Sequence, residues 1–398
     1  MKVKASVLFA SGLVCLVACG SGRTPFVDSP SVVGVVGVPY DRGSLGIGTD
    51  VWEVAVCAVP ADVTSDEFAP DTVRLDRSPA EIAELLSPVS DYFDRWSQGS
   101  YVPTFEPGAA VSIDSSQGSD ECVARAIAAS NETANGVIVV ADAPLTPDDP
   151  GGWGRVGDAC EQPCSVTESG RAVFVGATDF LPDWGDAPPL DLIEHELGHA
   201  IGWAHSSTLE GSGAGHDTYD SPYDVMSASD APRASNSERR HAPGVLAVNM
   251  LASGWLHSSE VREIEWASRP VGEWTDAVRV ASTDSLRDDG LARLVVLDLG
   301  AGRFVTLELL ADRGDDDHLT SPGLIVHELV TDGLSWNERP LIIMRADSGR
   351  LITTDGVTSV FSDSLLSVKV GAIVELDDGR VVADVRVRRD EPTEVRKS

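Results

Sequence analysis

The chain has 398 residues, 42% of them hydrophobic, and its 63 Asp and Glu against 30 Lys and Arg give a formal net charge of −33. A chain of this length holds about two domains with cores of their own, which excludes disorder throughout. The negative charge would repel phosphate backbones, so nucleic-acid binding is not expected. Aromatic residues make up 6%, and no run of about 18 apolar residues follows the N-terminus, which excludes a multi-span membrane protein.

The first residues have the pattern of an export signal. Two lysines precede an uncharged apolar run, residues 5–18, that is too short to span a bilayer as a mature helix. The run ends in Leu-Val-Ala before Cys19, and Gly-Ser-Gly follows. This pattern resembles the lipobox of bacterial lipoproteins, in which cleavage before the cysteine leaves its thiol carrying diacylglycerol. Residues 1–18 are therefore predicted to be a signal peptide and Cys19 to be lipidated; an ordinary signal peptide with an incidental cysteine is the alternative.

Residues 19–48 are predicted to be the lipidated cysteine and a flexible tether, because they are rich in Gly, Ser, Pro and Val and have no helical period. The protein is then expected to be exported and to lie in the bacterial cell envelope, on the outer face of the cytoplasmic membrane or on the outer membrane. Its contact with the membrane would run only through the N-terminal lipid.

The remaining cysteines indicate disulfides. One of the six cysteines would leave with the signal peptide and one would be lipidated, which leaves Cys57, Cys122, Cys160 and Cys164. Four cysteines in an exported chain suggest two disulfides, out of three possible connectivities. Cys160 and Cys164 would close a tight surface loop, which leaves Cys57 to pair with Cys122. A structural zinc site is the alternative, although the spacing lacks the C-x-x-C pairs that such sites use.

The folded part is expected to begin with an α/β layer over residues 49–261. Strand-like runs at 52–59, 109–113, 136–141 and 171–177 alternate with helical runs at 78–96 and 120–130. The first helix opens on Ser78-Pro79-Ala80-Glu81, which supplies an N-cap serine, a proline at the first position and an acid in the first turn. Pro88 predicts a kink or break in it, and residues 142–170 are predicted to form a loop.

The pattern changes after residue 262. Short, alternating, β-branched runs follow one another at 293–299, 304–310, 324–330, 341–344 and 368–388. Asp377-Asp378-Gly379 predicts a hairpin turn inside the last run. Residues 262–398 are therefore predicted to form a second, all-β domain of sandwich type.

Three of the eight histidines lie in the eleven-residue stretch HELGHAIGWAH, which begins at His195. His195 and His199 are four residues apart, so a helix would point both imidazoles at one metal ion. Glu196 lies next to that face, where its carboxylate could take a proton from metal-bound water and pass it on. An isolated HExxH can arise by chance, but the longer pattern makes a coincidence improbable.

A third ligand requires the helix to stop and the chain to turn. Gly202 can adopt a positive φ without steric cost, so it could end the helix and bring His205 to the same ion. Three imidazoles leave a fourth position for water, which is the arrangement of a catalytic zinc site, and zinc lowers the pKa of that water to about 7.

The pattern HExxHxxGxxH resembles the signature of the metzincin zinc endopeptidases. The resemblance implies a methionine turn beneath the metal, and Met226 in Tyr-Asp-Val-Met-Ser fits that apolar floor. The order of these motifs, followed by residues 244–256, resembles the gametolysin and immune inhibitor A group, whose β-rich segments residues 321–327 also resemble. The family implies an α/β (α+β) catalytic domain of metzincin type, with a mixed sheet and an active-site helix.

The chain departs from the wider clan in two respects. Astacins and serralysins have a tyrosine two residues after the turn methionine, where this chain has Ala228. Tyr219 and Tyr223 precede the methionine, so neither takes that role by motif. No cysteine-switch sequence is present, so latency through a propeptide of that type is not expected.

Other titratable residues near the motif have weaker patterns. His216, His241 and His257 are predicted to be solvated loop histidines, with His216 alternatively binding substrate or replacing His205 as a ligand. Two acidic clusters could hold calcium, although neither has EF-hand spacing and a solvated acidic face is favoured. Their members are Asp217, Asp220 and Asp224, and Asp312 with Asp315, Asp316 and Asp317.

The sequence thus predicts a lipid-anchored zinc endopeptidase that holds one catalytic Zn²⁺ and hydrolyses peptide bonds of extracellular proteins. Glu196 would be its general base, its partners would be protein or peptide substrates, and it would be a monomer that binds no nucleic acid. A surface adhesin or binding lipoprotein with a catalytically silent zinc site is one alternative, although the intact Glu196 argues against it. A zinc hydrolase of cell-wall amides is the other.

Overall fold

The computed structural model describes residues 45–69, 73–146, 151–158, 160, 164–208, 221–227, 239–266, 268–288, 290–300, 303–335, 339–346, 352, 356–360 and 366–391. The predictions for Cys19, His216 and Ala228, for Tyr219, Asp217 and Asp220, and for the signal peptide and most of the tether lie outside these residues. None of the helices in the described ranges has the length and apolar character needed to cross a membrane.

A mixed sheet forms the centre of the N-terminal part. Among the described residues it has five strands in the order β2-β1-β3-β5-β4. Neighbouring strands are parallel except at one edge, where β4 runs antiparallel to β5. The strands are β1 (Val51–Ala58), β2 (Thr104–Ser112), β3 (Gly136–Ala141), β4 (Gly152–Arg155) and β5 (Ala172–Val175). The predicted mixed α/β layer is therefore present, but β4 lies in a stretch that was expected to be a loop.

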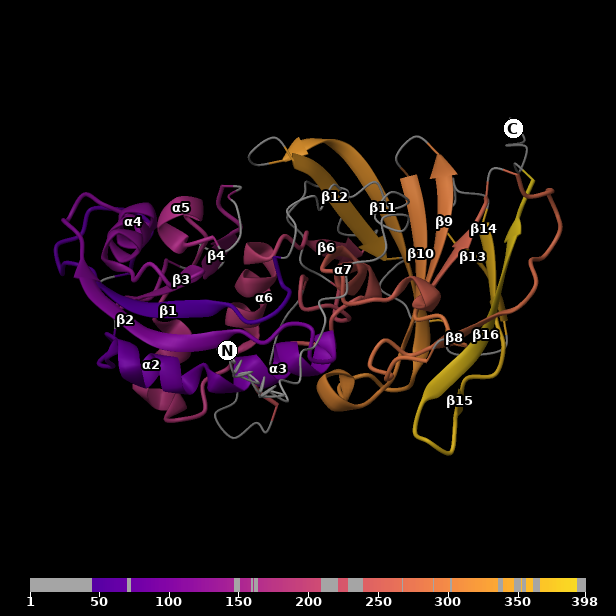
Figure 1. Cartoon of the computed structure of the whole chain (residues 1–398), viewed down its shortest axis with the longest axis horizontal. Helices are drawn as coiled ribbons and strands as arrows, with labels where there is room; N and C mark the ends of the chain where they lie inside the picture. The colour runs from indigo at the N-terminus through magenta and orange to yellow at the C-terminus, as the bar shows by residue number, and fades with distance from the viewer. Residues whose placement is uncertain are drawn as a thin grey trace, which may run out of the picture.

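Helices cover both faces of this sheet (Figure 1). Alternate strand residues point to opposite faces, so Trp52 and Val54 of β1 pack in one core and Cys57 packs in another. The first core also takes side chains from α2 (Pro79–Leu85), α3 (Ser87–Ser97) and α6 (Asp191–Ala200). The second takes them from α4 (Ser119–Ala129) and α5 (Val166–Ser169).

Local sequence determines how the first helices begin and end. Ser78 Oγ accepts a hydrogen bond from the Glu81 backbone N–H, and the Ser78 N–H donates to the Glu81 carboxylate, which completes a capping box. The single helix expected over 78–96 is two helices that meet at Leu86, because Pro88 cannot donate the backbone hydrogen bond that a continuous helix requires. The predicted break is thus a new helix start.

The C-terminal part contains two packed sheets, and its described regular structure after residue 261 is made of strands and one 3-10 turn, η5 (Gly314–Asp316). The six-stranded sheet has the order β6-β12-β11-β10-β9-β7, and the other sheet contains β13, β14, β16, β15 and β8. Apolar side chains from both sheets share one core, among them Val305 and Val368. The strands are β6 (Ser206–Thr208), β7 (Val261–Ile264), β8 (Val278–Ala281), β9 (Leu294–Gly300), β10 (Arg303–Leu310), β11 (Gly323–Ser335), β12 (Arg339–Ala346), β13 (Gly356–Val360), β14 (Leu366–Val370), β15 (Val374–Glu375) and β16 (Val381–Arg389).

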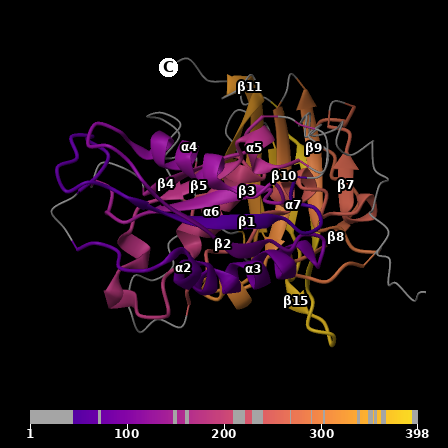
Figure 2. The ribbon, with the colours of Figure 1, turned by 60° about the vertical axis from the view of Figure 1, so that its left-hand side comes forward.

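Two features join this part to the rest of the chain. Strand β6 directly follows the HELGHAIGWAH stretch and pairs in parallel with β12. The core around α6 also includes side chains from β9, β10 and β11, such as Val296, Phe304 and Ile325. Figures 1 and 2 both show the short helix α7 (Ala247–Ala252) beside β10. The division into domains at residue 261 stays a prediction.

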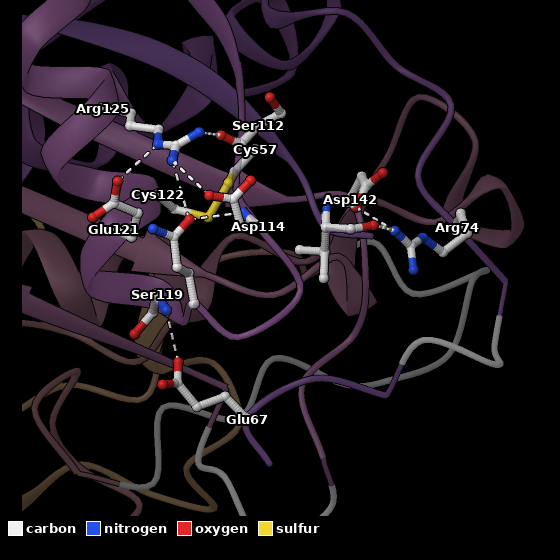
Figure 3. The surroundings of a disulfide bond; sticks show 12 residues. Cys57, Glu67, Arg74, Ser112, Asp114, Ser119, Glu121, Cys122, Arg125 and Asp142 are labelled. Carbon is white, nitrogen blue, oxygen red and sulfur yellow. Dashed lines mark hydrogen bonds and ion pairs between the residues drawn. A yellow bond between two sulfur atoms is a disulfide. The ribbon is translucent and has the colours of Figure 1, made fainter. Parts of the chain in front are cut away.

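Both expected disulfide pairs are present. Cys57 of β1 is bonded to Cys122 of α4 (Figure 3), and both residues are fully buried. Cys160 is bonded to Cys164, four positions further along the chain. These disulfides are compatible with an extracytoplasmic protein.

Candidate metal centre

The first two histidines lie on one face of α6, as the spacing predicts. The Nδ1 atom of His195 is 2.7 Å from the carbonyl oxygen of Val225, and Nδ1 of His199 is 3.0 Å from that of Trp203. A carbonyl oxygen only accepts hydrogen bonds, so both Nδ1 atoms carry the proton. The unprotonated Nε2 atoms are therefore left to bind a metal ion, with the ring orientations held by the backbone.

A sharp turn after α6 brings the third histidine to the other two. Gly202 has φ of +102°, a value that favours glycine, and the Trp203 N–H donates to the carbonyl of Gly198. The chain reverses, and Nε2 of His205 lies 2.6 Å from Nε2 of His199. One nitrogen from each of the three rings lies within 4.8 Å of the others. The turn at Gly202 therefore brings His205 close enough to the other two histidines to share a metal ion with them.

The three rings are held in the neutral form that metal ligation needs. Burial lowers the pKa of His195 to about 3 and that of His199 to about 4. Burial and the two neighbouring rings lower the pKa of His205 to about 2. Neutral imidazoles that converge through fixed Nε2 atoms suit a divalent transition metal such as zinc. Within the described ranges, no other group of three or more His, Cys, Asp or Glu side chains is close enough to share an ion.

Met226 lies directly beneath α6. Its side chain is fully buried, and a Cβ added at Gly198 would overlap its Sδ atom. The residue before it supplies the carbonyl that orients His195, and its own carbonyl accepts from the Ser206 N–H at 2.9 Å. The segment containing Met226 thus contacts the chain next to two of the three histidines, and its role as a methionine turn stays a prediction.

Glu196 is 4% exposed and faces the edge strand β4. A Cβ added at Gly152 would lie 3.4 Å from the Glu196 Oε1 atom, and one added at Gly154 would overlap the Glu196 carbonyl oxygen. The strand can approach α6 this closely only because the position facing the helix backbone, Gly154, is glycine. The sequence reading missed this contact; two glycines spaced at the strand period in Gly-Trp-Gly were the signal.

A buried ion pair holds the end of α6 and was also missed. The Arg171 guanidinium lies 2.6 Å from the carboxylate of Asp50, and its Nε–H donates to the carbonyl of Ala200, the last residue of the helix. Both partners are at least nine-tenths buried. No short sequence pattern predicts this ion pair, because Arg171 and Asp50 are 121 residues apart.

Several polar residues that were expected to be solvated are instead built into the structure. His241 stacks on Tyr92 and pairs with the buried Glu194. Burial by itself would lower the pKa of His241, but the Glu194 carboxylate outweighs this effect and the pKa is raised. His257 caps a 3-10 turn, η4 (Ser258–Glu260). Asp224 is fully buried, where it accepts from the Ser206 hydroxyl and burial raises its pKa to about 7.

The second acidic cluster is also partly internal. Asp315 pairs with Arg95, and Asp316 is 2% exposed and accepts from a backbone N–H. The picture of a solvated acidic face is therefore wrong for Asp224, Asp315 and Asp316, because backbone and side-chain donors far along the chain hold their carboxylates. The other two members of this cluster, Asp312 and Asp317, are exposed.

Comparisons with known proteins add little to this geometry. No model of a known protein family and no curated protein matches the sequence. Among solved structures, the chain is similar to metalloproteinase-II from Bacteroides fragilis, with 12% identity and a TM-score of 0.27. The match covers 56% of this chain and 60% of that protein, so the chain spans less than two thirds of its length. The class of protein is indicated by the three histidines, which can bind one metal ion. Such a site is typical of a metal-dependent hydrolase, for example a metalloprotease.

Proposed function

We propose that this protein is a zinc endopeptidase of metzincin type, most similar in its motifs to the gametolysin and immune inhibitor A group. One observation carries the proposal: three neutral imidazoles converge, and two of them are held by backbone carbonyls on the helix that also bears the buried carboxylate of Glu196. Zinc bound there would supply a Lewis acid that polarises the scissile carbonyl and makes water a stronger nucleophile at neutral pH.

In the proposed reaction, Glu196 carries one proton from the attacking water to the leaving nitrogen. Its carboxylate takes a proton from the attacking water as the oxygen adds to the carbonyl carbon of the peptide. It then delivers that proton to the leaving nitrogen as the C–N bond breaks, so that an acid and an amine are released and Glu196 is again ionised. The hydrogen bonds from the Nδ1 atoms of His195 and His199 keep the rings in place during these steps.

The position of β4 favours peptides as substrates. It is the last strand in the order of the described sheet, and it packs against α6 next to Glu196. An extended peptide could add to such an edge by backbone hydrogen bonds, which would lay its chain across the candidate metal centre.

Replacement of Glu196 tests the proposal. Glu196→Ala should bind zinc as the wild type does but cleave casein or a quenched peptide at least 10²- to 10⁴-fold more slowly, the loss typical of a missing general base. Glu84→Ala, at an exposed position of α2, is the matched control and should keep full activity. Cleavage by Glu196→Ala at the wild-type rate would refute the assignment.

The same assay separates two other functions. Zinc binding without cleavage of any member of a peptide library would indicate an adhesin with a silent metal site. Release of fragments from peptidoglycan, with no cleavage of proteins, would indicate a hydrolase of cell-wall amides.

We also propose an exported, monomeric lipoprotein, with a catalytic domain at 49–261 and a β-rich domain at 262–398. The lipobox-like sequence and the two disulfides support export. Metabolic labelling with a radioactive fatty acid should mark the wild type and leave Cys19→Ala unlabelled; equal labelling of both would contradict lipidation at Cys19.

A further inference from the structure

The loop between β10 and β11 extends from the C-terminal sheet to the floor of the candidate metal centre. Three of its polar side chains contact three separate segments of the N-terminal part. Asp315 accepts from the indole N–H of Trp96 at 2.8 Å, and Asp316 accepts from the Gly244 N–H at 2.8 Å. The Nε2–H of His318 donates to the carbonyl oxygen of Pro222 at 2.7 Å, close to the Met226 segment.

A continuous path of hydrogen bonds leads from Asp316 to His195. The Gly244 N–H donates to Asp316, and the Gly244 carbonyl accepts from the Val225 N–H at 3.1 Å. The Val225 carbonyl in turn accepts from Nδ1 of His195 at 2.7 Å. The backbone of two residues therefore connects a side chain of the loop between β10 and β11 to a predicted metal ligand.

The groups along this path are buried and closely packed. Asp316 is 2% exposed and Val225 is fully buried, so water cannot readily replace a lost partner. A Cβ added at Gly244 would lie 2.5 Å from the Trp96 ring and 2.7 Å from the Asp316 Oδ2 atom. A shift of Gly244 would thus move the Val225 carbonyl and, with it, the ring of His195.

A second carboxyl group holds the same segment. Glu308 of β10 is fully buried, and its Oε2 atom accepts from the Ala247 N–H at 2.5 Å. Burial raises the pKa of both Glu308 and Asp316 to about 8, so both are largely uncharged at neutral pH. A neutral carboxyl group can lie in this interior without a cation beside it.

We propose that Asp316 is a positioning residue of the candidate metal centre, and that it fixes the orientation of His195 through Gly244 and Val225. Through this loop, the C-terminal sheet then helps to hold a metal ligand in position. This rests on the proposed function only in that the three histidines bind zinc; it does not depend on which bond is cleaved.

Zinc affinity of three full-length variants tests this. Asp316→Ala removes the acceptor and should weaken zinc binding roughly 10- to 100-fold, the usual effect of losing a group that orients a metal-bound histidine. Asp316→Asn keeps an oxygen that can accept from Gly244 and should stay within about 3-fold of the wild type, since the native carboxyl is largely neutral. Asp317→Ala, at the exposed neighbour, should bind zinc unchanged.

The measurement is chelator competition at a temperature where circular dichroism shows each variant to be folded. A merely structural Asp316 would lower the melting temperature and leave zinc affinity unchanged, and that result would overturn the proposal. If Asp316→Ala does not fold, hydrogen exchange of the wild type decides: zinc should slow exchange at the Val225 and Gly244 amides. Equal exchange with and without zinc would also overturn it. If the proposed peptidase function were wrong, the Glu196→Ala assay would show this separately.

Discussion

The contact between Gly198 and Met226 makes a sharp prediction about the floor of the metal centre. A Cβ at Gly198 would overlap the Met226 Sδ atom and lie 2.7 Å from Cε3 of Trp203. In an exposed helix, Gly→Ala stabilises by about 1 kcal/mol, because glycine loses more backbone entropy on folding. Overpacking a buried site costs about 1–3 kcal/mol. Gly198→Ala should therefore destabilise the fold by up to about 2 kcal/mol, the opposite of the effect expected from helix propensity alone.

Urea unfolding of the zinc-free protein and chelator competition measure the two expected effects. Zinc affinity should fall together with stability, because the displaced Trp203 supplies the carbonyl that orients His199. Adding Met226→Ala removes the sulfur atom, so the penalty of Gly198→Ala should be smaller in that background, by about 0.5–3 kcal/mol in a double-mutant cycle. A Gly198→Ala protein that is as stable as the wild type, with unchanged zinc affinity, would refute the packing argument.

Two further predictions concern stability. Replacing Cys57 and Cys122 by alanine opens a loop with a sequence separation of 65, which should cost about 4 kcal/mol by loop-closure entropy, against about 2 for the other disulfide, whose separation is 4. Denaturant midpoints of the two double variants compare these costs, and a larger loss from the shorter loop would contradict the estimate. His327 is fully buried, and burial lowers its pKa to about 3. The unfolded chain takes up this proton below about pH 6.5, so the wild type should lose roughly 2–3 kcal/mol relative to His327→Leu between pH 7 and pH 4.5. Thr306→Val, at the facing position on β10, should give a difference that does not change with pH, and parallel pH curves for wild type and His327→Leu would rule the effect out.

The sequence by itself determined the features that depend on neighbouring residues. The spacing of His195 and His199 is a helix turn, and the reversal that brings in His205 needs one positive φ, which Gly202 supplies. The capping box at Ser78 and the break near Pro88 are equally local. The disulfide pairs could be inferred because so few cysteines leave few ways to connect them.

The tertiary structure alone decided what surrounds these residues. Arg171 reaches Asp50 across 121 positions, and Asp316 reaches Gly244 across 72. Such contacts depend on which layers pack together, and no short pattern encodes that. Asp316 is an acidic residue in an acidic run, so its sequence favours solvent; it is buried because a backbone N–H from another segment lies within reach. The histidines could thus be read from the chain, whereas the groups that orient them became visible only once distant segments were brought together.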